Sequence, residues 1–220
     1  MEKTQYFTAA NINAKTDRMF KDLKQRVELH TDKLNIDKSA LLILDMQRFF
    51  FDAKSHAFMP SASAIIRPIL KLSDLYIRNN RPIILTRHIN TSENAKMMDY
   101  WWRDILTEES PFSELIPEIA DIRNVTKIIQ KAQYDAFHET DLNNALTELN
   151  IEQLVIVGVI THLCCETTAR SAFVHGYNVF FPIDGTATYN ADIHQSTLIN
   201  LAHGFANITT IEKLNDQIVR

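Results

Sequence analysis

Short apolar runs alternate with longer amphipathic stretches along most of this 220-residue chain. Six of the runs have the length of strands, and three of these, 40–45, 82–86 and 154–159, have the apolar continuity of strands that are buried in a sheet. The six runs cover residues 40–45, 82–86, 125–130, 154–159, 178–184 and 207–211. Apolar residues at helical spacing predict helices over residues 61–80, 141–149, 162–176 and 191–205. This alternation predicts an α/β fold with a six-stranded parallel sheet and helices on both of its faces.

Two regions depart from this pattern. Residues 1–38 are polar and weakly patterned, with one short helical face at Phe20, Leu23 and Val27, and we interpret them as an N-terminal arm or extension. Residues 39–220 then form a single domain. The segment 88–123 is irregular and rich in aromatic and charged residues. For its tryptophans, Trp101 and Trp102, we expect one to cover the functional site or an oligomer interface and the other to lie in the core.

The charge and the apolar content of the chain indicate which kinds of binding partner to expect. The formal net charge is −4, from 23 basic and 27 acidic residues, and no basic patch stands out. We therefore expect neither nucleic acid nor a membrane as a partner. The apolar runs are too short to span a bilayer, and the N-terminus has no apolar secretion signal, so we expect a cytoplasmic location.

Glycine usage excludes several nucleotide-binding and catalytic motifs. The chain has only four glycines, and the first is Gly158. The glycine fingerprint of dinucleotide-binding folds, the phosphate-binding loop and the GxSxG nucleophile turn are therefore all absent. The two cysteines, Cys164 and Cys165, are adjacent and cannot form a disulfide framework or a zinc ribbon.

Three chemically capable residues lie at or just after the ends of predicted strands. Asp45 follows the first strand, Lys131 the third, and Cys164 lies in the first turn of the helix after the fourth. In parallel sheets the chemistry sits at these carboxyl ends. A helix N-terminus lowers a thiol pKa and offers free N–H groups to an oxyanion. Together the three could supply a base, a charge that orients it, and a nucleophile.

Each of these residues also has an ordinary structural explanation. Asp45 would serve equally as a loop or capping carboxylate, and Lys131 as a solvated surface residue. The cysteine pair would serve as two small apolar residues packed in a helix. The combination of all three at one sheet edge favours the chemical interpretation.

The segments LLILDMQ, KAQYDAF with the following TDL, and GVITHLCCETTARSA resemble the signature segments of the isochorismatase-like cysteine hydrolases. The resemblance covers roughly residues 39–211 and implies a three-layer α/β/α fold with a six-stranded parallel sheet. That family includes nicotinamidases, N-carbamoylsarcosine amidohydrolases, ureidoacrylate hydrolases and true isochorismatases. Its members are often dimers or tetramers, so we expect a homo-oligomer.

The resemblance assigns roles to the matching residues. Asp45 corresponds to the catalytic aspartate, Lys131 to the lysine and Cys164 to the nucleophile, with Cys165 as a packing residue. It also implies an oxyanion hole made by the backbone N–H groups of Thr161 and Cys164. A cis peptide bond is expected between Val159 and Ile160. The implied activity is a hydrolase that cleaves a C–N bond in a small amide, ureido or imide substrate through a thioester.

Two positions bear on the choice among family members. True isochorismatases usually carry glycine at the nucleophile position, where this chain has Cys164. In metal-dependent nicotinamidases an Asp and a His follow the second strand, and here His88 and Asn90 stand at those positions. That ligand set is absent, and we expect no metal and no other cofactor.

The candidate substrate contacts flank the motifs: they are Gln47, His88, Tyr134, Phe137 and His162. For His88 a polar loop role is equally open, and each of the others has a structural alternative. Three other functions stay open. They are a vinyl-ether hydrolase of the isochorismatase type, a non-catalytic thiol switch on the same fold, and a zinc-dependent nicotinamidase.

Overall fold

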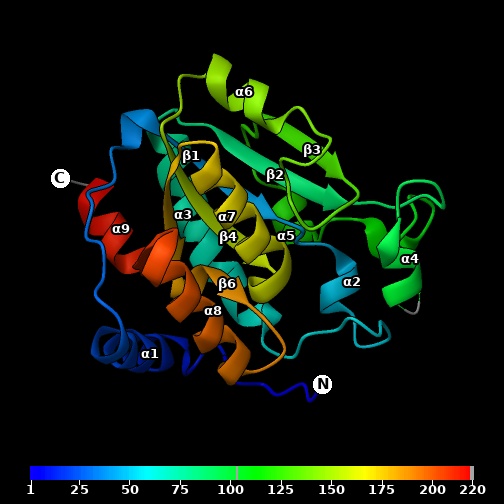
Figure 1. Ribbon diagram of the computed structural model, residues 1–220, viewed down its shortest axis with the longest axis horizontal. Coiled ribbons are helices and arrows are strands. Elements are labelled where there is room, and N and C mark those ends of the chain that lie inside the picture. The colour runs from blue at the N-terminus through cyan, green and yellow to red at the C-terminus, as the bar shows by residue number, and fades with distance from the viewer. Residues whose placement is uncertain (103, 219–220) are drawn as a thin grey trace.

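The computed structural model describes residues 1–102 and 104–218 of the chain (Figure 1). Residue 103 and the end of the predicted domain, 219–220, lie outside the described residues. Within the described part, a seven-stranded sheet is formed by parallel strands. The strands are β1 (Ser39–Leu44), β2 (Ile83–His88), β3 (Lys127–Lys131), β4 (Gln153–Val159), β5 (Asn178–Pro182), β6 (Thr186–Ala187) and β7 (Asn207–Thr209).

The longer helices follow the predicted alternation, and shorter ones interrupt the loops. They are α1 (Ile12–Arg26), α2 (Arg48–Phe51), α3 (Ile66–Arg78), α4 (Met97–Trp101), α5 (Pro117–Ala120), α6 (Leu142–Glu148), α7 (Glu166–Val174), α8 (Ala191–Gly204) and α9 (Ile211–Ile218). Pro68 lies in the first turn of α3, where its missing N–H removes no intrahelical bond. None of the described helices is both long enough and apolar enough to cross a membrane.

The strand order is β3-β2-β1-β4-β5-β7, and the two-residue β6 pairs with β4 off this path. The prediction of a parallel α/β sheet is therefore confirmed. The difference from six strands is β6, because the predicted strand over residues 178–184 ends at Pro182. A short 3-10 turn, Ile183–Gly185, follows and redirects the chain toward β4.

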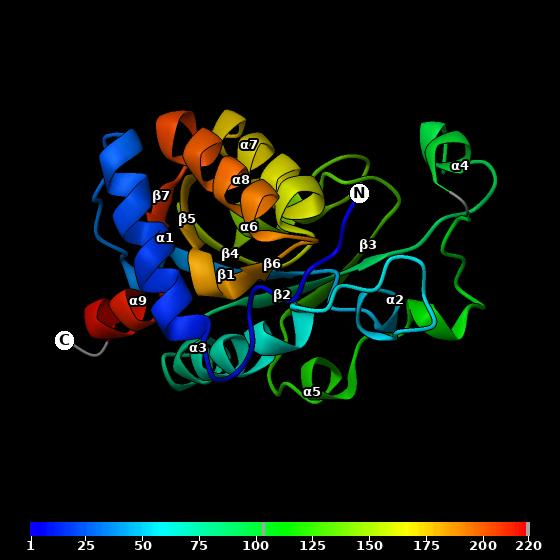
Figure 2. The ribbon, with the colours of Figure 1, turned by 90° about the horizontal axis from the view of Figure 1, so that it is seen from below.

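Helices cover both faces of the sheet. In Figure 2, α7 and α8 lie on one side and α3 and α5 on the other. Helix α9 packs against α3, and α1 packs against α8. The three-layer α/β/α arrangement follows from the parallel connections, each of which returns over one face of the sheet. The segment that carries α4 projects away from this body in the same view.

The N-terminal extension is anchored to the domain. Tyr6 and Phe7 are buried, at 5% and 0% exposure, and Leu23 on α1 is fully buried. Phe20 and Leu23 of the predicted helical face belong to α1, which begins earlier, at Ile12, whereas Val27 is the extended residue that follows the helix. The apolar side chains of this extension join the core of the main domain.

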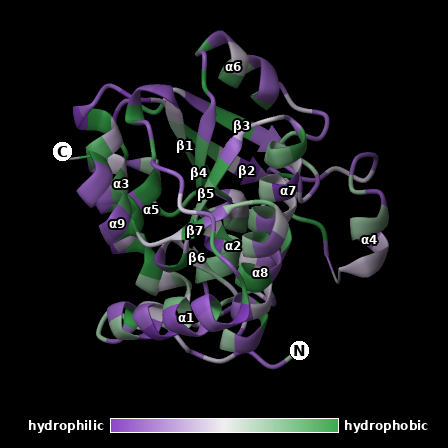
Figure 3. Ribbon diagram, turned by 60° about the vertical axis from the view of Figure 1, so that its left-hand side comes forward, coloured by the Kyte–Doolittle hydropathy of each residue, from purple (hydrophilic) through white to green (hydrophobic). Residues whose placement is uncertain are grey.

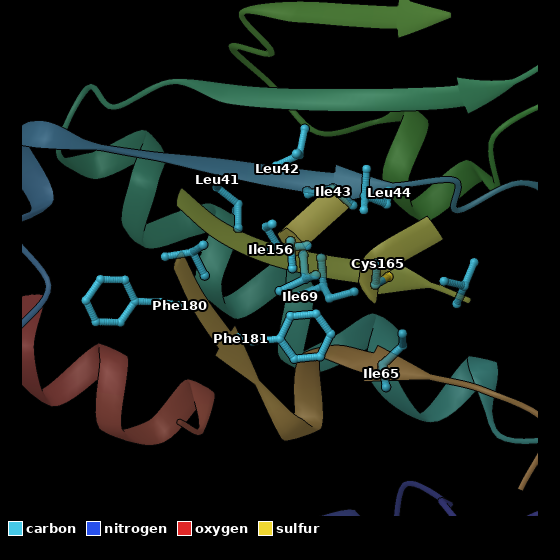
Figure 4. Close-up of a cluster of buried hydrophobic side chains, with 14 of the residues drawn as sticks. Leu41, Leu42, Ile43, Leu44, Ile65, Ile69, Ile156, Cys165, Phe180 and Phe181 are labelled. Carbon is cyan, nitrogen blue, oxygen red and sulfur yellow. The ribbon is translucent and has the colours of Figure 1, made fainter. Parts of the chain in front are cut away.

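Strands β1 and β4 form the centre of the core. All residues of β1 are buried, and the central part of the sheet is largely green in the hydropathy view (Figure 3). Figure 4 shows Leu41 and Ile43 of β1 among side chains from β4, β5 and α3. Cys165 lies in the same apolar cluster, which fits the packing role expected of it.

The strand order reverses between β1 and β4, so the loops after these two strands diverge at the carboxyl edge of the sheet. Here β4 crosses close to β1, and Leu44 is the register partner of Gly158. Gly158 has φ of +115°, and a Cβ built on it would lie 2.2 Å from the Leu44 carbonyl oxygen. Only glycine fits this crossing, and it allows β4 to end beside β1.

Because β4 and β1 approach so closely, adding a single methyl group at Gly158 is predicted to destabilise the protein strongly. Gly158→Ala is expected to lower the free energy of unfolding by at least about 3 kcal/mol, through the strained φ and the backbone clash. Gly204→Ala is the matched control, because a Cβ at Gly204 meets no atom within 4 Å. Urea unfolding measures both variants. Equal stabilities of the two would contradict the proposed constraint.

Candidate active site

Asp45 occupies a strained and fully buried position directly after β1. Its φ is 51°, a left-handed conformation that few residues other than glycine adopt, although aspartate is among those that tolerate it. The carboxylate oxygen Oδ1 accepts a hydrogen bond of 2.5 Å from the Thr86 hydroxyl. The Asp45 backbone N–H donates to the same hydroxyl oxygen at 3.1 Å. Thr86, in β2, therefore fixes both the backbone and the carboxylate of Asp45.

Lys131 joins Asp45 to Cys164. It is the last residue of β3, its side chain has 0% exposure, and its Nζ lies 2.7 Å from Asp45 Oδ2. The same ammonium donates to the Gln133 carbonyl at 2.9 Å and to the Cys164 sulfur at 3.4 Å. Burial alone lowers the pKa of Lys131, but Asp45 and Cys164 together raise it above its ordinary value. The lysine is therefore a fixed positive charge.

Cys164 is buried with 4% exposure, and its thiol interacts with the Asp45 carboxylate as well as with Lys131. Burial raises the pKa of the thiol to about 12, and the nearby Lys131 charge opposes that rise. The net shift is therefore opposite to the one that the helix N-terminus alone favours, because loss of solvation outweighs the favourable charges. The resting cysteine is a neutral thiol that needs a base.

The turn before α7 presents the nucleophile. The Val159–Ile160 peptide bond is cis, at the position that the resemblance implies. A π-helical turn, Thr161–Cys165, follows, and the Cys165 N–H donates to the Ile160 carbonyl at 3.2 Å. Thr161 and Cys164 lie in the first turn of the helix, where N–H groups lack ordinary intrahelical partners. Their N–H groups are the candidate oxyanion donors.

A pocket opens onto Cys164 and is lined mainly by aromatic and aliphatic side chains. Besides Cys164, it is lined by Phe49, Phe50, His56, Ala57, His88, Asn90, Met98, Trp102, Asp104, Ile105, Leu106, Tyr134, Ile160, Leu163 and Tyr189. The Trp102 indole N–H donates to the Tyr134 hydroxyl at 2.8 Å, which ties two of its walls together. An apolar pocket with a few polar groups is typical of a small-molecule site.

Two of the five predicted substrate contacts, His88 and Tyr134, line this pocket. Gln47 does not: its side chain donates to the carbonyls of His88 and Ser113 and accepts from the His88 N–H. It holds the end of β2 in place. Phe137 stacks instead on His175, with ring centroids 4.8 Å apart. These two residues have structural roles.

His162 lies behind the pocket wall. Its Nδ1 is 2.7 Å from the Thr188 hydroxyl, and its ring contacts the ring of Tyr189. Burial lowers its pKa below the ordinary value for histidine. It therefore supports Tyr189, which itself lines the pocket.

His88 and Asn90 form a pair within the pocket. His88 Nε2 lies 2.8 Å from Asn90 Oδ1, and the Asn90 amide donates to the Ala132 carbonyl at 2.9 Å. Burial first, and then the Lys131 charge, lowers the pKa of His88 to about 4, so its imidazole is neutral at physiological pH. Neutral imidazole and amide groups are suited to hydrogen bonding with a polar group of a bound molecule.

Trp101 and Trp102 lie in different surroundings. Trp102 lines the pocket, whereas Trp101 is 71% exposed at the end of α4. The expectation that one of them lies in the core is therefore wrong. Trp101 is the last residue of α4, and this helix projects from the body of the molecule (Figure 2).

Sequence reasoning missed Thr86 and most of the pocket wall. Thr86 ends the apolar run PIILT, and a single polar residue at the end of a buried strand is a usable signal for a site residue. Phe49 lies in the short helix α2, and His56 and Tyr189 lie in loops; the approach of all three to Cys164 depends on tertiary structure.

The model of the isochorismatase domain family matches residues 39–213 of the chain. The chain belongs to this family. Nicotinamidase 3 of Arabidopsis thaliana is 35% identical over 184 residues, covering 82% of this chain and 89% of that protein. The isochorismatase of Bacillus subtilis is 29% identical over 83% of this chain, which spans only 58% of that protein's length.

The fold also matches solved structures of the family. A cysteine hydrolase from Pseudomonas syringae pv. phaseolicola superposes with a TM-score of 0.82 at 26% identity, over 88% of this chain and 98% of that one. The family membership and this similarity establish the chain as an isochorismatase-family hydrolase.

The Thr86 hydroxyl bonds both the backbone and the carboxylate of Asp45, so its removal is predicted to lower the stability of the protein. Thr86→Val keeps the side-chain shape but leaves the Asp45 N–H and Oδ1 without their hydroxyl partner. We expect it to lower the free energy of unfolding by about 1–3 kcal/mol, as for other unsatisfied buried groups. Thr86→Ser keeps the hydroxyl and should recover most of that loss in urea unfolding. A Thr86→Val protein as stable as the wild type would show that the hydroxyl does not hold Asp45.

Proposed function

We propose that this protein hydrolyses the C–N bond of a small amide, ureido or imide substrate through a thioester on Cys164. The supporting observation is the contact of the Cys164 thiol with Asp45 and Lys131 beside the pocket. A neutral buried thiol next to a carboxylate base is an arrangement suited to acyl transfer. The fixed Lys131 charge pairs with that carboxylate at 2.7 Å and holds it in place.

The first half of the reaction forms the thioester. Asp45 takes the proton from the Cys164 thiol as the sulfur attacks the substrate carbonyl carbon. The backbone N–H groups of Thr161 and Cys164 stabilise the negative oxygen of the tetrahedral intermediate, a contribution of several kcal/mol in enzymes where one donor has been removed. The C–N bond then breaks, and Asp45 gives its proton to the departing nitrogen.

The second half restores the enzyme. A water molecule gives a proton to Asp45 and attacks the thioester carbon, so that a C–O bond forms. The C–S bond breaks, and the proton on Asp45 returns to the sulfur. Lys131 stays charged throughout and holds the carboxylate in place through both halves.

The pocket favours a substrate with a flat apolar part. Phe49, Trp102, Tyr134 and Tyr189 contribute aromatic side chains to its walls. Aromatic rings in such walls pack well against another ring. The relative with 35% identity is named a nicotinamidase, so nicotinamide is the first substrate to test.

The alternatives give different products. The similarity to the Bacillus subtilis isochorismatase favours a vinyl-ether hydrolase as the second candidate, which would release no ammonia. A thiol switch would release no product and would not require Lys131. A zinc-dependent nicotinamidase would release ammonia and contain zinc by elemental analysis.

Replacement of Cys164 tests the proposal directly. Ammonia release is measured over nicotinamide, small aliphatic amides and ureido acids. We expect Cys164→Ala to lower the rate on an accepted substrate by at least about a thousandfold, because it removes the nucleophile. Cys165→Ala is the matched control: Cys165 packs in the core, and we expect this variant to keep the wild-type rate within about threefold. A Cys164→Ala enzyme with the wild-type rate would exclude the thioester mechanism.

A further inference from the structure

The first residues of the chain lie against two segments that line the pocket. We call residues 2–7 the N-terminal strap. They precede the part of the chain that matches the family model, which starts at residue 39. The end of the chain that carries the strap lies between β6 and α2 in the view of Figure 2. The contacts of the strap connect it to residues 56–61 and 188–190.

The strap holds the segment after β6 through its backbone and through two side chains. The Thr4 N–H donates to the Tyr189 carbonyl at 2.8 Å. The Thr188 N–H donates to the Tyr6 hydroxyl at 3.0 Å. The Lys3 ammonium lies 4.4 Å from the centre of the Tyr189 ring, within the range of a cation–π contact. These three contacts fix both the backbone and the ring of Tyr189.

The strap also holds the loop before α3. The Lys3 ammonium donates to the His56 carbonyl and, at 3.0 Å, to the Phe58 carbonyl. The Tyr6 N–H donates to the buried Ser61 hydroxyl at 2.9 Å. A lysine ammonium has three donors, so one side chain can bind two carbonyls while its charge lies over a ring.

Lys3 thus joins two walls of the pocket from outside. Both His56 and Tyr189 line the pocket together with Cys164. The His56 ring is further held by Asp104, whose Oδ1 lies 2.7 Å from His56 Nδ1. Without Lys3, the backbone at residue 56 loses its tie to the strap, and the wall formed by Tyr189 loses its cation partner.

We propose that the N-terminal strap is a specificity-determining element, in which Lys3 ties His56 to Tyr189 and so limits the size of the molecule that reaches Cys164. Lys3 is a positioning residue, because it acts through the two walls. The consequence for substrate selection depends on the hydrolase function proposed above, whereas the limit on access to Cys164 does not.

Alkylation of Cys164 measures access without any substrate. The rates of modification by iodoacetamide and by the bulkier N-ethylmaleimide are compared, with the Cys164 peptide followed by mass spectrometry. In Lys3→Met we expect the N-ethylmaleimide rate to rise about tenfold and the iodoacetamide rate to change less than about twofold. Met keeps the length of the side chain but removes its charge and donors.

Two variants control the comparison. Lys3→Arg keeps a charged donor and should retain most of the wild-type ratio of the two rates. Lys21→Met removes an exposed lysine from α1 and should leave the ratio unchanged. Thermal melting checks the fold of each variant, and Lys3→Gln provides the same test if Lys3→Met lowers the melting temperature. An unchanged rate ratio in a folded Lys3 variant would overturn the proposal.

Kinetic constants for hydrolysis by Lys3→Met test the role of the strap separately from the proposed hydrolase function. For an amide that the wild type hydrolyses, Lys3→Met should raise KM about tenfold and change kcat less than twofold, because Asp45, Lys131 and Cys164 keep their contacts. A fall in kcat with unchanged KM would contradict a role in the pocket walls. If the wild type hydrolyses no amide, the proposed function fails, and the alkylation ratio still decides the role of the strap.

Discussion

The ion pair of Asp45 and Lys131 is the interaction on which the site depends. Both side chains have 0% exposure, and the two charged atoms lie 2.7 Å apart. Removing an ion from water costs several kcal/mol, and mutual attraction offsets this cost only when the geometry and the remaining hydrogen bonds are good. Thr86 and the Gln133 carbonyl supply those further bonds. A buried pair of this kind contributes little net stability, which favours a chemical role for it.

The fold supplies the geometry that the pair requires. Strands β1, β2 and β3 lie side by side, so Asp45 after β1 and Lys131 at the end of β3 meet beside Thr86 of β2. Strand β4 brings Cys164 to the same point from the other side of the switch in strand order. The absence of a side chain at Gly158 allows β4 to approach Leu44. Gly158, one of the four glycines of the chain, is therefore required at its position by the geometry of the site.

The sequence predicts the parts of this arrangement that follow from local pattern. Continuous apolar runs identify the buried strands, and the residues that end them include Asp45 and Lys131. The thiol pKa was not predictable in this way, because a local helix N-terminus favours the thiolate while burial by the whole fold disfavours it more. Gln47 and Phe137 flank the motifs in sequence, but their side chains bond to β2 and stack on His175. His56 and Tyr189 line the pocket, and Lys3 contacts both of them. Each of these contacts joins residues more than fifty positions apart, so local sequence pattern does not predict them.

The central claim is that Cys164 becomes acylated during turnover. Rapid acid quenching of the enzyme with an accepted amide, followed by mass spectrometry of the intact protein, measures this directly. We predict a transient species heavier than the free enzyme by the acyl group, located on the Cys164 peptide and absent from Cys164→Ala. Steady formation of product with no such species, under quenching fast enough to resolve single turnovers, would contradict covalent catalysis by this cysteine.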